Sequence, residues 1–356
     1  MKALKTRLIK ILLFIFLGLV TVFTFVVLMV YQIWFKPNVI VHGQPETSLY
    51  IRTNATFDQV KDSLYSHGFI LHHRTFEWLA GKKQYPQQVE PGRYILRSGM
   101  NNNDLINMLR AGLQTPVQVI VNNIRLKKDL AGKVSRQLET DSLTLLQLLS
   151  DSVYLSEYGL DTETSLTMFI PNTYEFYWNT DAKDFFERMN KEYGKFWDME
   201  REKKRIRTGM TRQQVSILAS IIEKETLKND EKARMAGVYM NRLRDAWKLQ
   251  ADPTVVFVVG DFKMTRVLTR HTRIDSPYNT YLYEGLPPGP ICVPSIASID
   301  AVLNYEEHDY YYFCAREDFS GYHNYARTYN QHLVNAGKYQ RAYQQRKRAE
   351  GKSTGS

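Results

Sequence analysis

The residues best suited to take part in a chemical reaction are two glutamates, Glu223 and Glu225, in the triplet EKE. A capping-box signature, Thr211 with Gln214, precedes the apolar run before them and predicts that a helix starts there. At about 100° per residue, the two carboxylates point to opposite faces of that helix. Glu225 shares its face with Val215, Leu218, Ile221 and Ile222, whereas Glu223 lies with Ser216, Ala219 and Ser220. One carboxylate of the triplet therefore faces the direction in which the helix buries itself.

A carboxyl held against apolar side chains loses the hydration of its charged form, which raises its pKa. Glu225 would then be protonated near neutral pH and could serve as a general acid. The alternative is that Glu225 simply ends the helix and its side chain bends back to solvent. For a single helix taken alone, that alternative is the commoner arrangement.

Four more motifs rich in polar residues or proline follow the triplet at short spacing. They are NRL at 241–243, QADPTV at 250–255, SPYNTY at 276–281 and GLPPGPI at 285–291. Asn241 and Arg242 offer hydrogen bonds of fixed geometry. Arg242 could instead form a structural ion pair, and Glu223 is the favoured partner because a guanidinium beside Glu225 would lower the pKa of that carboxyl. The prolines of the last motif fix φ and favour a rigid groove wall.

In their order and spacing, these five motifs resemble the YceG-like family, the MltG-type endolytic murein transglycosylases. The resemblance covers most of the chain and is strongest at 165–335. It implies that the second glutamate of the triplet, here Glu225, is catalytic, and the helical-face argument selects the same residue independently. It also implies a single catalytic carboxyl, so Asp252 would order its loop or bind substrate. Ser295 stands where the family often has glycine.

The predicted substrate-binding residues come from these motifs and from the C-terminal segment. They are Asn241, Arg242, Gln250, Asp252, Tyr278, Asn279, Thr280, Tyr281, His323 and Tyr325. Tyrosine and asparagine side chains combine ring stacking with recognition of hydroxyl groups. A lone histidine is usually structural. His323 and His332 both match polar positions of the family's C-terminal motif, and the pair favours a binding role more than a single histidine would.

The resemblance implies cleavage of the β-1,4 bond between N-acetylmuramic acid and N-acetylglucosamine inside a glycan strand. Protonated Glu225 would protonate the bridging oxygen and then, as carboxylate, take the proton from the muramyl C6 hydroxyl, which attacks C1 and leaves a 1,6-anhydro end. A tethered nucleophile has an effective molarity on the order of 10⁵ M or more. Two alternatives stay open, namely a hydrolase of the same bond in which Asp252 directs water, and a non-catalytic glycan-binding scaffold of the envelope.

The composition argues against a nucleic-acid partner and a cofactor. The net charge of +10 is concentrated in the first ten residues and in two runs, 201–207 and 344–352, which we interpret as a topology signal and solvated faces. The sequence contains no CxxC, HExxH or glycine-rich phosphate motif, so we expect neither a metal nor a cofactor. We expect the two cysteines, Cys292 and Cys314, to be free thiols rather than a disulfide.

Residues 11–35 contain no charged residue and end in the aromatic residues Tyr31, Trp34 and Phe35. About 20 apolar residues span a bilayer, and a cleaved signal peptide would have a shorter apolar region. Basic residues before the span place the N-terminus in the cytoplasm. We therefore predict a single-pass protein of the inner membrane whose remaining chain is outside the cytoplasm, with peptidoglycan strands as substrate and peptidoglycan synthases as candidate partners.

The predicted fold class is α+β with five segments along the chain. They are a basic cytoplasmic tail (1–10), a transmembrane helix (11–35), a LysM-like α/β module (38–125), a mixed α/β YceG-like catalytic domain (126–340) and a flexible basic tail (341–356). In the module we expect one helix ended by Gly68 and another capped by Asn103 and ended by Gly112. Whether the module binds glycan or is a spacer stays open. For the whole protein, the resemblance implies a role in terminating nascent glycan strands.

Overall fold

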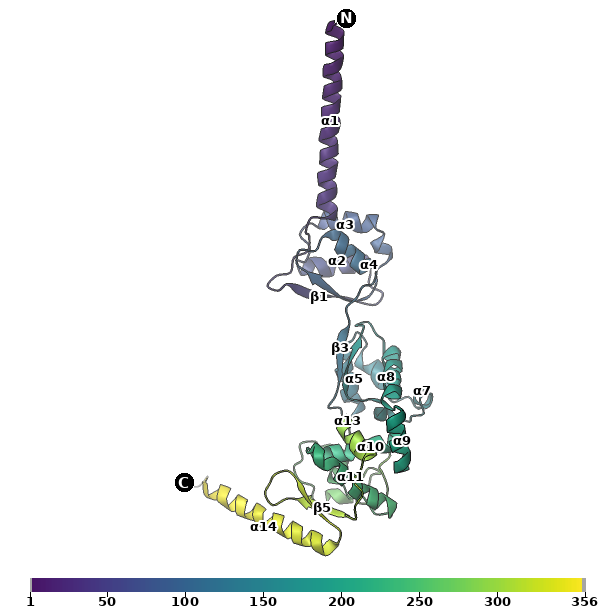
Figure 1. The fold of residues 1–356 in the computed structure, drawn as a ribbon, viewed down its shortest axis with the longest axis vertical. Coiled ribbons are helices and arrows are strands. Elements are labelled where there is room, and N and C mark those ends of the chain that lie inside the picture. The colour runs from purple at the N-terminus through teal and green to yellow at the C-terminus, as the bar shows by residue number, and fades with distance from the viewer. Residues whose placement is uncertain (1, 354–356) are drawn as a thin grey trace. The chain divides into compact units, whose positions relative to one another are not determined.

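The computed structural model describes residues 2–353, which form two compact units. The first unit takes in the chain up to Gln118 together with Gln137–Glu139 and Glu175–Thr180. The second takes in Val119–Arg136, Thr140–Tyr174 and the chain from Asp181 onward. The change of unit at Gln118 falls shortly before the predicted boundary at 125. Figure 1 shows the elements of both units.

The chain begins with a long apolar helix, α1 (Lys2–Trp34) (Figure 1). Its segment Arg7–Trp34 is long and apolar enough to cross a membrane, judged by length and composition. The predicted span at 11–35 coincides with this segment to within one residue at its C-terminal end. A signal sequence near the N-terminus would pass the same test, so the membrane anchor stays a prediction.

The first unit contains a two-stranded antiparallel sheet, β1 (Glu46–Ile51) with β2 (Gly92–Arg97), in which Glu46 lies opposite Arg97. Three helices and a 3₁₀ turn accompany it: α2 (Phe57–Ser66), α3 (His73–Lys82), η1 (Tyr85–Gln87) and α4 (Asn102–Arg110). Leu49, Leu64, Phe76, Tyr94 and Leu105 are buried in their common core. The order strand, helix, helix, strand agrees with an α/β module, although the sequence analysis did not foresee α3.

Local residues explain where the helices of the first unit begin and end. Thr56 and Gln59 form a capping box at the start of α2, and Gly68 follows its end with φ +66°, a conformation that glycine adopts without strain. At α4 the prediction of the cap was wrong. The side chain of Asn101, not Asn103, accepts the hydrogen bond from the backbone N–H of Asp104.

The last turn of α1 is joined to the first unit through a buried asparagine. Asn102 is fully buried, and its Nδ2 donates to the carbonyl of Ile33 at 3.0 Å and to Thr75 Oγ1 at 3.1 Å. Its Oδ1 accepts from Asn38 Nδ2 at 2.6 Å. The ring of Trp34 packs edge to face on Trp78, with 5.5 Å between the centroids. These contacts make the end of α1 part of the folded unit.

The second unit is mostly helical. Its helices are α5 (Lys127–Ser135), α6 (Ser142–Leu148), α7 (Ser152–Ser156), η2 (Ser165–Met168), α8 (Ala182–Phe196), α9 (Met199–Thr208), α10 (Arg212–Glu225), α11 (Asn229–Arg244), α12 (Asp252–Val259), η3 (His271–Arg273), α13 (Ile296–Leu303) and α14 (Tyr329–Ser353). Two small sheets complete the described chain, β3 (Val117–Val121) with β4 (Asn172–Phe176) and antiparallel β5 (Tyr312–Ala315) with β6 (His323–Ala326). The segment predicted as a flexible tail from 341 is helical up to Ser353.

Helix α10 is the centre of the second unit, and it packs against α11, α12 and α13. The predicted capping box is confirmed, since Thr211 accepts from the N–H of Gln214 and the Gln214 side chain accepts from the N–H of Thr211. Every residue from Val215 to Ile222 is buried. The expectation of one buried face was therefore wrong. Ser216, Ala219 and Ser220 are covered as well, and Ser220 Oγ accepts a 3.0 Å hydrogen bond from the backbone N–H of Ile291.

Candidate active site

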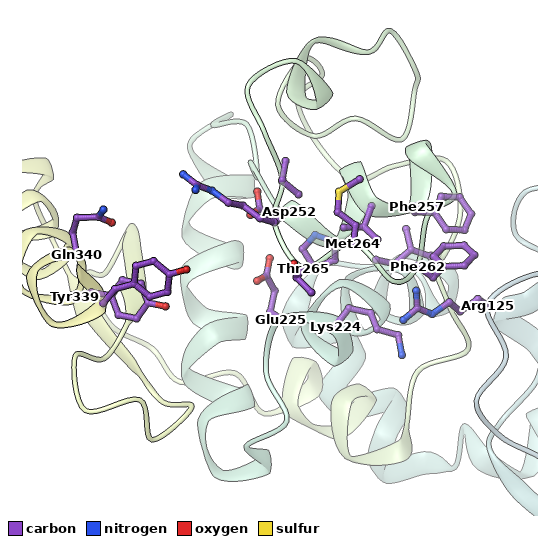
Figure 2. A pocket seen from close by; sticks show the side chains of 16 residues that line it. Arg125, Lys224, Glu225, Asp252, Phe257, Phe262, Met264, Thr265, Tyr339 and Gln340 are labelled. Atoms are coloured by element: carbon purple, nitrogen blue, oxygen red, sulfur yellow. The ribbon is translucent and has the colours of Figure 1, made fainter. Parts of the chain in front are cut away.

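Glu225 is the last residue of α10, and its side chain lines a pocket of about 800 Å³. Figure 2 shows its carboxyl pointing into this pocket, with Asp252 on one side and Lys224 on the other. Met264, Phe257 and Phe262 supply apolar surface on the same wall. The pocket therefore combines a carboxyl, a second acid, cations and aromatic rings in one space.

The environment of Glu225 gives it the titration behaviour of an acid near neutral pH. Burial raises the pKa of its carboxyl from the ordinary value of 4.5 to about 7, and the charge of Asp252 adds to this rise. A hydrogen bond from Tyr239 and the charges of His323 and Arg242 act in the opposite direction and are outweighed. The carboxyl lines the pocket although it is desolvated, so a bound substrate can reach it.

Tyr239 of α11 sets the orientation of this carboxyl. Its hydroxyl donates to Glu225 Oε1 at 2.8 Å, and its side chain is fully buried. Burial also raises the pKa of Tyr239 well above its usual value, so the hydroxyl keeps its proton and remains a donor. Glu225 Oε2 is left as the oxygen free to exchange a proton with a ligand.

Glu223, the first carboxylate of the triplet, has a different environment. Its Oε2 accepts from Lys232 Nζ at 3.0 Å and from the hydroxyls of Ser295 and Ser298 at 2.5 Å each. Burial by itself would raise the pKa of Glu223, but these donors outweigh it and lower the pKa. Ser295 also caps α13 with φ −64°, so the serine fits the backbone at the position where the family often has glycine.

The alternative in which Arg242 pairs with Glu223 is not what the structure has, because Lys232 is the cation that binds Glu223. Arg242 Nε donates to the carbonyl of Tyr311 at 2.8 Å, and its Nη1 donates to the carbonyl of Leu249 at 2.5 Å. Asn241 Nδ2 donates to the carbonyls of His308 and Tyr310 at 2.7 and 3.0 Å. Both side chains are buried, and they hold the segment before β5 against α11.

Asp252 and Tyr281 form a second polar pair at the pocket. Asp252 is the first residue of α12, followed by Pro253, a residue suited to the first turn of a helix. The Tyr281 hydroxyl donates to Asp252 Oδ1 at 2.6 Å. Asp252 is exposed and lines the same pocket as Glu225. The structure thus brings together the two carboxyls that the sequence analysis weighed as acid and partner.

The remaining predicted residues of the 250–281 segment differ in their exposure. Gln250 is exposed with φ +49°, and its backbone N–H donates to the carbonyl of Thr280 at 3.0 Å. Asn279 and Thr280 are buried, and their side chains bond to backbone groups of the same region. The Tyr278 hydroxyl donates to Glu163 at 2.9 Å. Asn279 and Thr280 therefore shape the loop that carries Tyr281.

His323 and Tyr325 lie on β6, behind the buried side of Tyr239. His323 Nδ1 is 2.8 Å from Glu231 Oε2, and its backbone N–H donates to Glu231 Oε1 at 2.8 Å. The rings of His323 and Tyr325 both pack on Phe313, which in turn packs edge to face on Tyr239. In this arrangement the two residues support the donor of Glu225.

Several pocket residues were not identified from the sequence. They are Arg125, Lys224, Val256, Phe257, Phe262, Met264, Thr265, Arg266, Val267 and, on α14, Tyr339, Gln340 and Tyr343. Tyr339 and Tyr343 are four residues apart and so share one helix face, a signal that was available. Lys224, Val256 and Phe257 lie on α10 and α12, whereas Arg125 and the residues from Phe262 to Val267 come from irregular segments without a recognisable pattern. Among the residues that the structure describes, no group of three or more His, Cys, Asp or Glu side chains could hold a metal ion, and both cysteines are free thiols.

Comparison with known proteins places the sequence in a family. A family model described as the YceG-like family matches residues 49–338. An endolytic murein transglycosylase of Bacillus subtilis (strain 168) is 27% identical over 250 residues, which cover 64% of this chain and 68% of the relative. An endolytic murein transglycosylase of Streptococcus pneumoniae (serotype 2, strain D39) is 26% identical over 307 residues, 77% of this chain. The chain spans about half of that relative's length, 53%.

A solved structure shows the same fold. The crystal structure of a yceG-like protein from Listeria monocytogenes matches with a TM-score of 0.54 over 81% of this chain and 98% of the other. Its sequence identity is 22%, so the likeness concerns the fold alone. Because the family model matches most of the sequence, the chain belongs to the YceG-like family.

Proposed function

We propose that this chain is a membrane-anchored endolytic peptidoglycan lytic transglycosylase with Glu225 as its general acid and base. It cleaves the bond between N-acetylmuramic acid and N-acetylglucosamine within glycan strands. The observation that carries the proposal is a carboxyl with a pKa of about 7 that opens into a pocket of about 800 Å³. Relatives named endolytic murein transglycosylases support the reaction class.

The first step is protonation of the leaving group. At a pKa of about 7, a large share of Glu225 carries its proton at neutral pH. Oε2 donates this proton to the bridging oxygen while the bond to the muramyl C1 lengthens. The N-acetylglucosamine side leaves as an alcohol, and positive charge develops on C1 and the ring oxygen.

The second step closes the muramyl ring on itself. Glu225 is now a carboxylate, and it removes the proton from the C6 hydroxyl of the same muramyl residue. The C6 oxygen forms a bond to C1, which gives the 1,6-anhydro end and returns Glu225 to its protonated form. Since the nucleophile belongs to the same ring, no water has to be positioned. The apolar side chains of Phe257, Phe262 and Met264 help to keep water from C1.

The other predicted site residues take three roles in this proposal. Asp252, held by Tyr281, raises the pKa of Glu225 and faces the developing positive charge, and Gln250 and Tyr278 bind sugar hydroxyls or rings near the groove. Asn241, Arg242, Asn279 and Thr280 hold the loops that carry these groups. His323 and Tyr325 support Tyr239 from behind.

A hydrolase of the same bond is the second candidate, because Asp252 lines the pocket with Glu225 and could direct a water molecule. The two reactions differ in their products. Hydrolysis gives reducing ends, whereas the transglycosylase gives 1,6-anhydro ends. Identifying the ends therefore separates the candidates directly.

The position in the cell is part of the proposal. Helix α1 would cross the inner membrane with its basic N-terminus in the cytoplasm and both units outside. The first unit would be the LysM-like module, acting as glycan-binding module or spacer. In this setting the enzyme would cut nascent strands and end their elongation beside peptidoglycan synthases.

The test is digestion of purified peptidoglycan strands by the full-length protein, with product ends identified by mass spectrometry. We expect 1,6-anhydromuramyl ends from the parent and a loss of about 10²–10⁴ in rate for Glu225→Gln, which keeps the shape but cannot donate the proton. Asp252→Asn serves as the matched carboxyl variant and should retain anhydro products. Reducing ends from the parent would favour the hydrolase, and an undiminished rate for Glu225→Gln would refute the assignment of the acid.

A further inference from the structure

We propose that Arg125 and Lys224 form a carboxylate-binding subsite that recognises the stem peptide carried by muramyl residues. This inference rests on the proposed function, since it names the part of peptidoglycan that the same pocket takes besides the sugar rings. Both side chains line the pocket of Glu225. Figure 2 shows Asp252 on one side of Glu225 and these two side chains on the other.

Arg125 is held in a conformation suited to a planar anion. Its guanidinium lies over the ring of Phe262, with 4.5 Å from Cζ to the ring centroid. The ring covers one face of the guanidinium and leaves the N–H edge for a ligand. In the part of the chain that the structure describes, no carboxylate lies within salt-bridge distance of Arg125. A bidentate carboxylate is the partner that such an edge fits best.

Lys224 adds a second cation in the same region. It precedes Glu225 in the last turn of α10, and no salt bridge to it is formed among residues 2–353. Both cations also act on the buried thiol of Cys292. Burial raises the pKa of this thiol to about 12, and the charges of Lys224 and Arg125 both act to lower it. Arg125 and Lys224 thus line the same pocket, and neither forms a salt bridge with an acidic side chain of the described residues.

Arg125 and Lys224 are not the main charges that oppose the raised pKa of Glu225. The charges that oppose the rise of the Glu225 pKa most strongly are those of His323 and Arg242, not those of Lys224 or Arg125. Arg266 is a further cation on the pocket lining, so three basic residues face two carboxyls there. A pocket of this balance attracts an anion while Glu225 stays protonated.

The chemistry of peptidoglycan identifies the anion. The N-acetylated sugar rings carry no charge, and the lactyl group of a muramyl residue is neutral once a peptide is attached to it. The negative charges lie on the carboxylates of that peptide, which starts from C3 of the same ring whose C1 is attacked. A ring held with C1 at Glu225 therefore brings the first peptide residues within a few ångströms of the pocket wall, about 3.5 Å per residue when extended.

Binding measurements test the subsite without relying on turnover. The probe is a muramyl tetrasaccharide with tetrapeptide stems, compared with the same compound after its peptide carboxylates have been converted to neutral methylamides. The protein is the full-length chain carrying Glu225→Gln, so that the probe is not cut. We expect affinity for the charged probe to exceed that for the neutral one by about tenfold.

Three variants test which side chains cause the preference for the charged probe. Arg125→Gln and Lys224→Gln should each reduce this ratio several-fold and leave affinity for the neutral probe unchanged. Lys263→Gln removes an exposed cation that does not line the pocket, and it should keep the ratio. Equal affinities for both probes, or an equal loss in all three variants, would refute the subsite.

The outcome is distinguishable from a failure of the proposed function. If the parent protein releases no anhydro ends while charge-dependent binding persists, the reaction is wrongly assigned and the subsite stands. If anhydro ends form while charged and neutral probes bind equally well, the subsite is refuted and the reaction stands.

Discussion

The hydroxyl of Tyr239 donates a 2.8 Å hydrogen bond to Oε1 of Glu225. Because Tyr239 is fully buried on α11 and Glu225 ends α10, the bond fixes the carboxyl between two packed helices. It also selects which oxygen meets the ligand, since only Oε2 is left without this donor. A proton donor that must act and then recover its proton benefits from such a fixed orientation.

Replacement of Tyr239 by phenylalanine should change the pH dependence of cleavage. The hydrogen bond lowers the pKa of Glu225, so its loss should raise that pKa above about 7. Since the first step needs protonated Glu225, the alkaline limb of the rate profile should move to higher pH, while the maximal rate falls about tenfold through loss of orientation. Initial rates across pH 5–9 for parent and variant measure both effects. An unmoved limb would contradict the role of Tyr239.

The stability of the protein should respond to the titration of Glu225. A carboxyl whose pKa rises from 4.5 unfolded to about 7 folded binds its proton more tightly in the folded state. The contribution of Glu225 to the free energy of unfolding is therefore fully present below pH 4.5 and is lost as the pH rises through 7. Relative to the parent, Glu225→Gln should gain roughly 2–3 kcal/mol in free energy of unfolding above pH 7. Urea titrations at pH 5 and pH 8 provide the measurement, and an equal difference at both values would rule out the shift.

Glu223→Gln should weaken the fold while leaving the chemistry in place. The substitution leaves Lys232, which is almost fully buried, without a charged partner and weakens the bonds from Ser295 and Ser298. We expect a loss of about 2–4 kcal/mol in stability. Activity per folded molecule, measured well below the midpoint of thermal unfolding, should stay near that of the parent. A variant of parental stability without activity would mean that Glu223 and Glu225 have exchanged roles.

Gly237 marks a close approach that only glycine allows. A Cβ at this position of α11 would lie 2.1 Å from the carbonyl oxygen of Glu306. Gly237→Ala should therefore destabilise the protein by at least about 1–3 kcal/mol, although alanine favours helix formation. Gly194→Ala is the matched control, because Gly194 lies in α8 with nothing within 4 Å of a new Cβ, and it should gain about 0.5–1 kcal/mol. Thermal unfolding of both variants checks the pair, and equal shifts would contradict the close contact.

The direction of the Glu225 side chain could be predicted because it depends on local rules. The capping residues Thr211 and Gln214 set where α10 begins, and the helical period then fixes the side to which Glu225 points. The partner of Glu223 depends instead on distant segments. Lys232 comes from α11, and Ser295 and Ser298 come from α13. Periodicity carries no information on which of several cations reaches a carboxylate across such a distance.

The residues of the pocket wall could not be predicted from the sequence for the same reason. Arg125 and Phe262 are far apart in the sequence and belong to segments without regular structure, yet they pack together beside Glu225. The strand β6 was missed because its four residues, His323–Ala326, pair only with the equally short β5. Short strands of mixed polarity have no signal strong enough to outweigh their neighbours. The family resemblance identified the motifs, but it gave no information on these contacts.

The junction at the end of α1 has a mechanical consequence. Asn102 holds the carbonyl of Ile33 from inside the first unit, and Trp34 is wedged against Trp78. Rotation of the apolar helix about its own axis must therefore turn the whole first unit with it. The joint transmits torque where a glycine- or serine-rich linker would let the two parts swivel independently.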